Sequence, residues 1–143
     1  YTAPERPAAP DQFRVIPGRA ALHTQASTTN NPLLSELAPT NTLWIHKERA
    51  QALGIADGDW VEVCTATGPV GRLRAKVTTG IHPEAVFMLH GFGRKTPQET
   101  RAFGKGVADE ACMISGLEHE DPLGGGLALQ KHFVTIRKAE ETN

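Results

Sequence analysis

The chain has 143 residues, which is enough for one domain around a single buried core. Hydrophobic residues make up 39% of it and charged residues 22%, a composition typical of a globular protein rather than a disordered one. Fifteen lysines and arginines stand against sixteen aspartates and glutamates, so no bulk positive charge is available for nucleic acid or an anionic membrane surface. No apolar run reaches the length of a membrane span, so direct membrane insertion is not expected.

The first residues differ in composition from the rest of the chain. Residues 1–12, YTAPERPAAPDQ, carry three prolines and show no hydrophobic periodicity, so we expect a linker or a cut end. The domain is then expected to cover residues 13–143. Its first strand is followed by PGRAALHTQASTTNNPLL, a run of hydrogen-bonding side chains that predicts a long polar loop. Loops of this length in a small domain usually have a function.

Alternation of polar and apolar residues, bounded by glycine and proline turns, predicts six short strands. We expect these strands at residues 13–16, 43–46, 60–65, 70–77, 85–89 and 132–138. A short helix is expected over residues 47–53, ended by Gly54 in a left-handed conformation, and a helical turn near residues 97–103. Short strands around one core close most economically into a small barrel. The predicted fold is therefore mainly β, with one or two short helices and two long polar loops.

The sequence contains no recognisable catalytic or metal-binding motif. The six histidines are scattered without zinc-binding spacing, so no metal site is predicted, and neither a nucleophile elbow nor a phosphate-binding P-loop is present. Cys64 and Cys112 are too far apart for a CxxC redox pair, and we expect two buried free thiols rather than a disulfide. We therefore predict no catalytic residue in this chain.

A binding function fits the two polar loops better. His23 and His90 both lie in these loops, near the ends of strands. Glycines expose backbone N–H groups, Arg19 offers a planar fork for phosphate, and threonine, glutamine and asparagine can bond the edges of a polar heterocycle. Together these groups predict a large, polar, phosphate-bearing ligand.

Four segments of the chain resemble, in order, the C-terminal domain of large subunits in the dimethyl sulfoxide reductase family of molybdenum enzymes. These segments are PGRAALHTQASTTNNPLLSEL, LWIHKERAQALGIADGDWVEV, GRLRAKVTTGIHPEAVFMLHGFG and DPLGGGLALQKHFVTIRKA. The resemblance covers residues 13–139. It is greatest to the thiosulfate and polysulfide reductase catalytic subunits, because of HTQ…NNPLL, LWIH and HGFG.

The resemblance implies a six-stranded double-psi β-barrel that binds bis(molybdopterin guanine dinucleotide) molybdenum. The cofactor-binding positions that it implies are Gly18, Arg19, His23, Thr24, Gln25, Thr28, Asn30, Asn31, His90, Gly91, Phe92 and Gly93. By resemblance, Arg19 neutralises phosphate, His23 and Thr24 bond the pterin or diphosphate, and the HGFG turn lets the backbone approach the cofactor where a Cβ would obstruct it. The family often has an asparagine in the segment GVADEACMI. Asp109 and Glu110 stand there instead, so no contact is carried over to that segment.

The resemblance also implies a larger enzyme. The family's [4Fe-4S] cluster and its molybdenum ligand come from other domains of the same catalytic subunit, so the 143-residue domain alone is expected to be inactive. The implied reaction is two-electron reduction of a sulfur–sulfur bond. The implied partners are an iron–sulfur electron-transfer subunit and a membrane anchor subunit, at the periplasmic or outer face of the cytoplasmic membrane.

Three other interpretations are compatible with the same residues. In the first, the chain belongs to the same family, but the enzyme acts on another oxyanion, such as arsenate or tetrathionate. The chain can be a stand-alone barrel that binds a nucleotide-like ligand or delivers the cofactor, without a redox role. It can also be a structural domain that caps a partner subunit.

Overall fold

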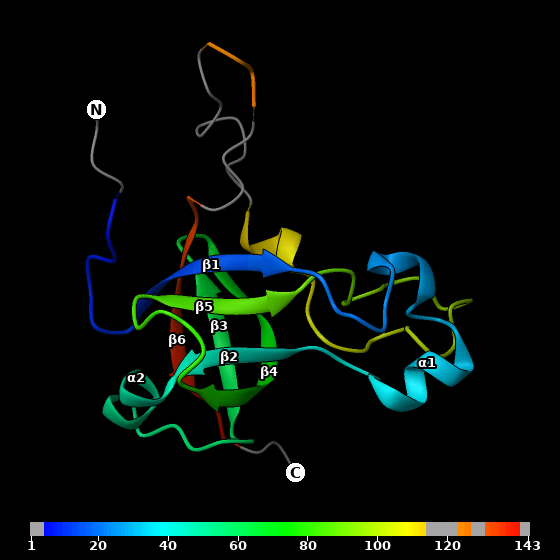
Figure 1. Ribbon diagram of the computed structural model, residues 1–143, viewed down its shortest axis with the longest axis horizontal. Coiled ribbons are helices and arrows are strands. Elements are labelled where there is room, and N and C mark those ends of the chain that lie inside the picture. The colour runs from blue at the N-terminus through cyan, green and yellow to red at the C-terminus, as the bar shows by residue number, and fades with distance from the viewer. Residues whose placement is uncertain (1–4, 114–122, 127–130, 141–143) are drawn as a thin grey trace.

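The computed structural model describes residues 5–113, 123–126 and 131–140. Within them, six strands close into one barrel in the order β1-β5-β2-β4-β3-β6 (Figure 1). The strands are β1 (Gln12–Gly18), β2 (Thr42–His46), β3 (Trp60–Thr65), β4 (Gly68–Thr78), β5 (Ala85–Leu89) and β6 (Phe133–Lys138). The predicted mainly-β barrel is confirmed, and each predicted strand coincides with an observed one.

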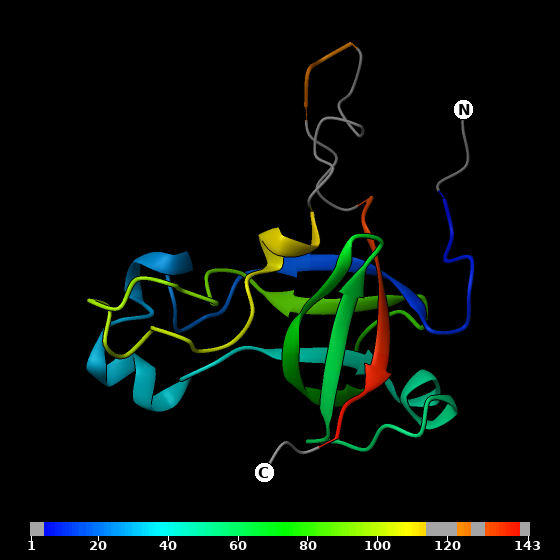
Figure 2. The same cartoon turned by 180° about the vertical axis from the view of Figure 1, so that it is seen from behind.

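The strand pairing has an internal twofold pattern. β1 pairs in parallel with β5 and β2 pairs in parallel with β4, whereas the other four pairings are antiparallel. Exchanging β1 with β4, β2 with β5 and β3 with β6 turns the β1–β5 pairing into β2–β4 and the β1–β6 pairing into β3–β4, each with the same direction. The β2–β5 and β3–β6 pairings map onto themselves. This interlocking of two three-stranded halves is the predicted double-psi arrangement. Seen from behind, β4, β3 and β6 form the wall of the barrel nearest the viewer (Figure 2).

The barrel interior is apolar because alternate residues of each strand point inward. Side chains with at most 1% exposure come from all six strands: Phe13, Val15, Leu43, Ile45, Val61, Val63, Leu73, Val86, Met88, Val134 and Ile136. Burying one side chain of this size stabilises the folded state by about 1.5–3 kcal/mol. The core therefore fixes the barrel and leaves the loops at its ends to carry function.

In the described part of the chain, two α-helices and two 3-10 helices accompany the barrel. They are η1 (Gln25–Thr28), α1 (Pro32–Leu37), α2 (Lys47–Ala52) and η2 (Asp109–Cys112). α2 is the helix predicted over residues 47–53, and Gly54 follows it with φ +66° as expected. No helix among the described residues is long and apolar enough to cross a membrane.

Two local predictions are wrong in part. The polar stretch predicted as one loop contains η1 and α1, because Asn31 caps α1 by accepting from the backbone N–H groups of its second and third residues. Conversely, residues 97–103 form turns rather than a helix. A single helical hydrogen bond there, from Phe103 N–H to the Glu99 carbonyl, is not continued into a second turn.

The long loops meet at one end of the barrel. We call residues 19–41 together with residues 90–108 the loop lobe, which projects beyond the ends of β1 and β5 on the right of Figure 1. Asn41 is 1% exposed and ties this lobe to the barrel. Its amide donates to the carbonyls of Leu89 and Val107 at 2.9 and 2.8 Å, and its Oδ1 accepts from Val107 N–H at 3.0 Å.

Both cysteines are free thiols, as predicted, although only Cys112 is fully buried and Cys64 is half-buried. Burial raises the pKa of the Cys112 thiol to about 12, and the carboxylates of Asp109 and Glu110 act in the same direction. Because the thiolate is the reactive form, Cys112 is chemically inert in the folded protein.

We predict that Asn41→Ala lowers the free energy of unfolding by at least about 2 kcal/mol, because it leaves buried backbone groups without partners. Urea denaturation measures the change. Gln51→Ala, at an exposed position of α2, is the control and is expected to change the free energy by less than about 0.5 kcal/mol. Equal stability of the Asn41 variant and the unsubstituted protein would contradict the role assigned to this side chain.

We also predict that only Cys64 reacts with an aromatic disulfide reagent at pH 8 in the folded protein. At that pH fewer than about one in a thousand Cys112 thiols are ionised. Absorbance of the released thiolate counts the reactive cysteines. The Cys64→Ala variant is expected to release none until it is unfolded, and rapid release from that variant would show that Cys112 is accessible and ionised.

Candidate cofactor-binding site

The parallel pairing of β1 with β5 brings the starts of the two polar loops together. Gly18 is opposite Leu89 in the register, and His90 N–H donates to the Gly18 carbonyl at 2.8 Å. Arg19 and His90 are therefore neighbours although 71 positions separate them. The resemblance implied that both residues bind one cofactor, and the strand pairing explains why they are neighbours.

A pocket of about 260 Å³ opens where these loops leave the barrel. It is lined by Pro17, Gly18, Arg19, Gln25, His90, Asp109, Glu110 and Met113. Of the residues predicted to bind a cofactor, Gly18, Arg19, Gln25 and His90 line this pocket. Arg19 is exposed and, in the described part of the chain, has no ion pair or hydrogen bond. Its guanidinium is free to meet an anionic group of a ligand.

The HGFG turn packs closely against other backbone of the loop lobe, and Gly91 is the point at which it meets the first loop. Gly91 has φ +99°, and a Cβ there would lie 2.5 Å from the carbonyl carbon of Gln25. Gly93 has φ +76°, and its Cβ would lie 2.3 Å from the backbone nitrogen of Ala108. These contacts require glycine at both positions for a reason within the chain, and the expectation that the HGFG turn lets the backbone approach a cofactor stays a prediction. The space that a Cβ would occupy is filled by this chain's own backbone, and the turn is fixed against the first loop.

His23 lies inside the loop lobe rather than in the pocket. Its side chain is buried, Nε2 lies 2.9 Å from the Ala38 carbonyl oxygen, and Nδ1 lies 3.3 Å from Thr28 Oγ1. Because a carbonyl only accepts, Nε2 carries the proton. The ring also meets Phe92 edge-on, with centroids 5.5 Å apart. The two loops are therefore held in place by His23, Thr28 and Phe92. The polar side-chain atoms of His23 and Thr28 are engaged within the chain.

The remaining predicted residues are distributed over the surface of the lobe. Thr24 is exposed, and its backbone N–H donates to Thr28 Oγ1 at 2.8 Å. Asn30 Oδ1 accepts from the backbone N–H groups of Arg101 and Ala102, so it joins the first loop to the second. Asn31 is occupied as the cap of α1. Thr24, Asn30 and Asn31 are not among the residues that line the pocket.

The second wall of the pocket is acidic. His90 Nδ1 lies 3.0 Å from both carboxylate oxygens of Asp109 and 3.3 Å from Glu110 Oε1. Only 1% of the Asp109 side chain is exposed, compared with 60% for Glu110 and 31% for His90. The ligand atoms of these three residues lie within 4.8 Å of one another, and the His90 Nδ1–H is shared between the two carboxylates.

Asp109 and Glu110 were missed as site residues by the sequence analysis. They follow His90 by 19 and 20 positions, and no local pattern links a histidine to carboxylates at that separation. The position of η2 over the end of β1 brings them together (Figure 1). The acidic residues of the segment GVADEACMI were visible in the sequence, but their burial against His90 was not.

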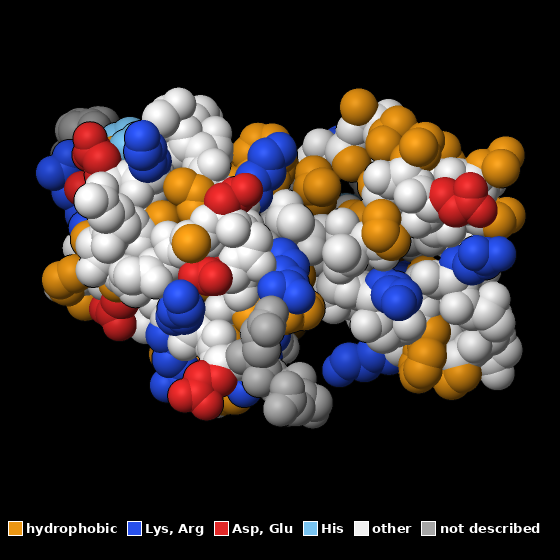
Figure 3. Space-filling view, turned by 90° about the horizontal axis from the view of Figure 1, so that it is seen from below, with side chains coloured by type: hydrophobic (Ala, Val, Ile, Leu, Met, Phe, Trp, Pro, Cys, Tyr) orange, Lys and Arg blue, Asp and Glu red, His pale blue; other side chains and the backbone are white. Residues whose placement is uncertain are grey.

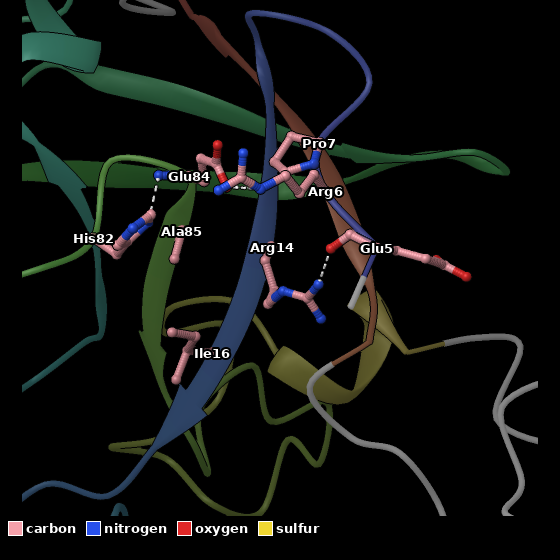
Figure 4. Close-up of a pocket in the computed structure, with 8 residues that line it drawn as sticks. All are labelled: Glu5, Arg6, Pro7, Arg14, Ile16, His82, Glu84 and Ala85. Carbon is pink, nitrogen blue, oxygen red and sulfur yellow. Dashed lines mark hydrogen bonds and ion pairs between the residues drawn. The ribbon is translucent and has the colours of Figure 1, made fainter. Parts of the chain in front are cut away.

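A second pocket, of about 340 Å³, lies beside β1 and the start of β5. Figure 4 shows its lining, in which Arg14 donates to the Glu5 carbonyl and Arg6 pairs with Glu84. None of the residues predicted to bind a cofactor lines it, and its cations are engaged by neighbouring acceptors. We therefore place the candidate site in the first pocket.

Comparisons with known proteins show the family to which the chain belongs. Residues 13–132 match the family model described as "Molydopterin dinucleotide binding domain". The thiosulfate reductase molybdopterin-containing subunit PhsA of Salmonella typhimurium is 41% identical over 97 residues, which are 68% of this chain and 13% of that protein. The chain thus spans only a small part of the length of this relative.

Solved structures also align with this chain, and that of acetylene hydratase shows the same fold. Acetylene hydratase from Pelobacter acetylenicus aligns with 89% of this chain and 18% of its own, at 20% identity and a TM-score of 0.72. The computationally designed msDPBB_sym2 protein aligns with 90% of this chain and 96% of its own, at 15% identity and a TM-score of 0.44. On the family match, the chain belongs to the molybdopterin dinucleotide-binding domains.

Proposed function

We propose that this chain is the C-terminal cofactor-binding domain of a catalytic subunit that carries bis(molybdopterin guanine dinucleotide) molybdenum and reduces the sulfur–sulfur bond of thiosulfate or polysulfide. The observation that carries the proposal is the pocket at the end of the barrel, where Arg19 and Gln25 of the first loop face His90 of the second. The name of the relative with 41% identity favours thiosulfate over arsenate or tetrathionate as the substrate.

The groups around the pocket fit a dinucleotide of this kind. The Arg19 guanidinium has the planar fork that binds phosphate oxygens in pairs, and the Gln25 amide can donate and accept at a heterocycle edge. At about 260 Å³, the pocket has room for one portion of so large a molecule, so this chain would cover one side of it. When bound, the cofactor supplies the two-electron chemistry, and the protein binds and orients it.

The chain's own residues divide into two groups under this proposal. Arg19, Gln25 and His90 contact the cofactor, because they line the pocket. His23 and Thr28 position the first loop, because their polar atoms bond within the lobe. Neither group contains a nucleophile or a molybdenum ligand, so we propose that the isolated domain does not reduce substrate.

An exposed apolar surface supports packing against other domains of a larger subunit. Leu33 and Leu37 of α1 are 72% and 69% exposed, and Phe103 of the second loop is 48% exposed. Figure 3 shows apolar side chains gathered on the loop lobe. Exposed large apolar side chains grouped in this way are typical of protein contacts. The [4Fe-4S] domain, the iron–sulfur subunit, the membrane anchor and the location outside the cytoplasmic membrane stay predictions from the resemblance.

We predict that Arg19→Ala in the full-length subunit weakens cofactor retention by about 10–100-fold, because it removes charge-assisted hydrogen bonds to phosphate. Molybdenum per subunit, measured by mass spectrometry after dialysis, reports the loss. Arg101→Ala, an exposed arginine of the same lobe outside the pocket, is expected to keep its molybdenum. Equal metal content in both variants would contradict the assignment of Arg19.

A second prediction uses two glycines that both have positive φ. Gly91→Ala should lower both stability and molybdenum content, because its Cβ meets the Gln25 backbone, whereas a Cβ on Gly104 meets nothing within 4 Å. Gly104→Ala is therefore expected to cost only the strain of its conformation, about 1–3 kcal/mol, and to retain the metal. If the two variants bind molybdenum equally well, the packing of the loops does not form the site.

A further inference from the structure

The residues that line the pocket carry charges of both signs, and these charges come from two segments of the chain. Arg19 provides a cation on the wall formed by the first loop, whereas Asp109 and Glu110 provide carboxylates on the wall formed by η2. A phosphate is attracted to the first wall and repelled from the second. The carboxylates of η2 therefore fit a part of the ligand that donates hydrogen bonds. This assigns different parts of a dinucleotide to different residues of the pocket.

His90 has one ring nitrogen left for a ligand. Its Nδ1 is held by both oxygens of Asp109, and since a carboxylate only accepts, Nδ1 bears the proton. In the described part of the chain, Nε2 has no hydrogen-bond partner. The buried Asp109 thus acts as a positioning residue, because it fixes the ring of a histidine that lines the pocket.

Glu110 retains most of its capacity to accept hydrogen bonds. The Glu110 side chain is 60% exposed. Among the described residues, the one side-chain nitrogen of a basic residue within 4 Å of its carboxylate is His90 Nδ1, at 3.3 Å, which it shares with Asp109. The second carboxylate oxygen is available at the pocket edge. A carboxylate accepts two parallel N–H bonds from a group that presents an amino group beside a ring N–H, as it does from a guanidinium.

We propose that Glu110, with His90 held by Asp109, binds the 2-amino-4-oxopyrimidine edge that pterin and guanine share. This inference rests on the proposed function, since both rings belong to the dinucleotide cofactor. The amino group and the adjacent ring N–H donate to the Glu110 carboxylate, and His90 Nε2 meets the same ring system. The phosphates lie toward Arg19, at the start of the first loop.

Nuclear magnetic resonance titrations of the ¹⁵N-labelled 143-residue chain test this inference with four simple probes. Guanosine monophosphate is compared with inosine monophosphate, which lacks the 2-amino group, and pterin is compared with lumazine, in which an oxygen replaces it. We expect the aminated member of at least one pair to bind about tenfold more tightly, with shifts at His90 and Glu110. The pair with the larger ratio identifies whether the base or the pterin occupies this wall.

Glu110→Gln keeps the size of the side chain and removes the charge, and because the side chain is exposed the variant should fold normally. We expect it to abolish the tenfold preference, whereas Glu48→Gln on α2 should retain it. Equal affinities within both pairs, shifts confined to other residues, a preference that survives Glu110→Gln, or no binding up to millimolar concentrations would each overturn the inference. The molybdenum content of the Arg19 variant tests the proposed function separately, so the two failures are distinguishable.

Discussion

The site depends on the parallel pairing of β1 with β5. Parallel neighbours end at the same edge, so the chain leaves Gly18 and Leu89 side by side and begins a polar loop from each. An antiparallel pairing would place the loops at opposite ends of the barrel, and no common pocket would form. The apolar interior fixes this register, because a slip by one residue would turn the inward side chains of β1 outward.

The two loops then restrict each other's conformation through close contacts. Gly91 fits against the Gln25 backbone, Asn30 joins the two loops, and Asn41 fastens the second loop to the barrel end. His23 fills the interior of the lobe with both nitrogens bonded. The polar groups that line the pocket are few and carry charges of both signs. Such preorganisation lowers the cost of ordering the site when a ligand binds.

Much of the fold could be predicted from the sequence, and less of the site. Strands 60–65 and 85–89 were predicted with their observed bounds, because burial of one or both faces produces a local pattern. η1 and α1 were missed, although Asn31 before Pro32 is a cap signal, because the surrounding polar residues favoured a loop. The site prediction brought Arg19 and His90 together only through resemblance. The pairing of His90 with Asp109 could not be predicted, because it depends on the position of η2 over the barrel.

The central claim is that the pocket between the two loops holds the molybdopterin dinucleotide. A structure of the cofactor-loaded full-length subunit, by crystallography or electron cryomicroscopy, tests it most directly. We predict a cofactor phosphate within hydrogen-bond distance of Arg19 and a ring edge within hydrogen-bond distance of His90 or Glu110. Density for the cofactor only at the second pocket, beside Arg14 and Glu84, or with no contact to either loop, would contradict the account.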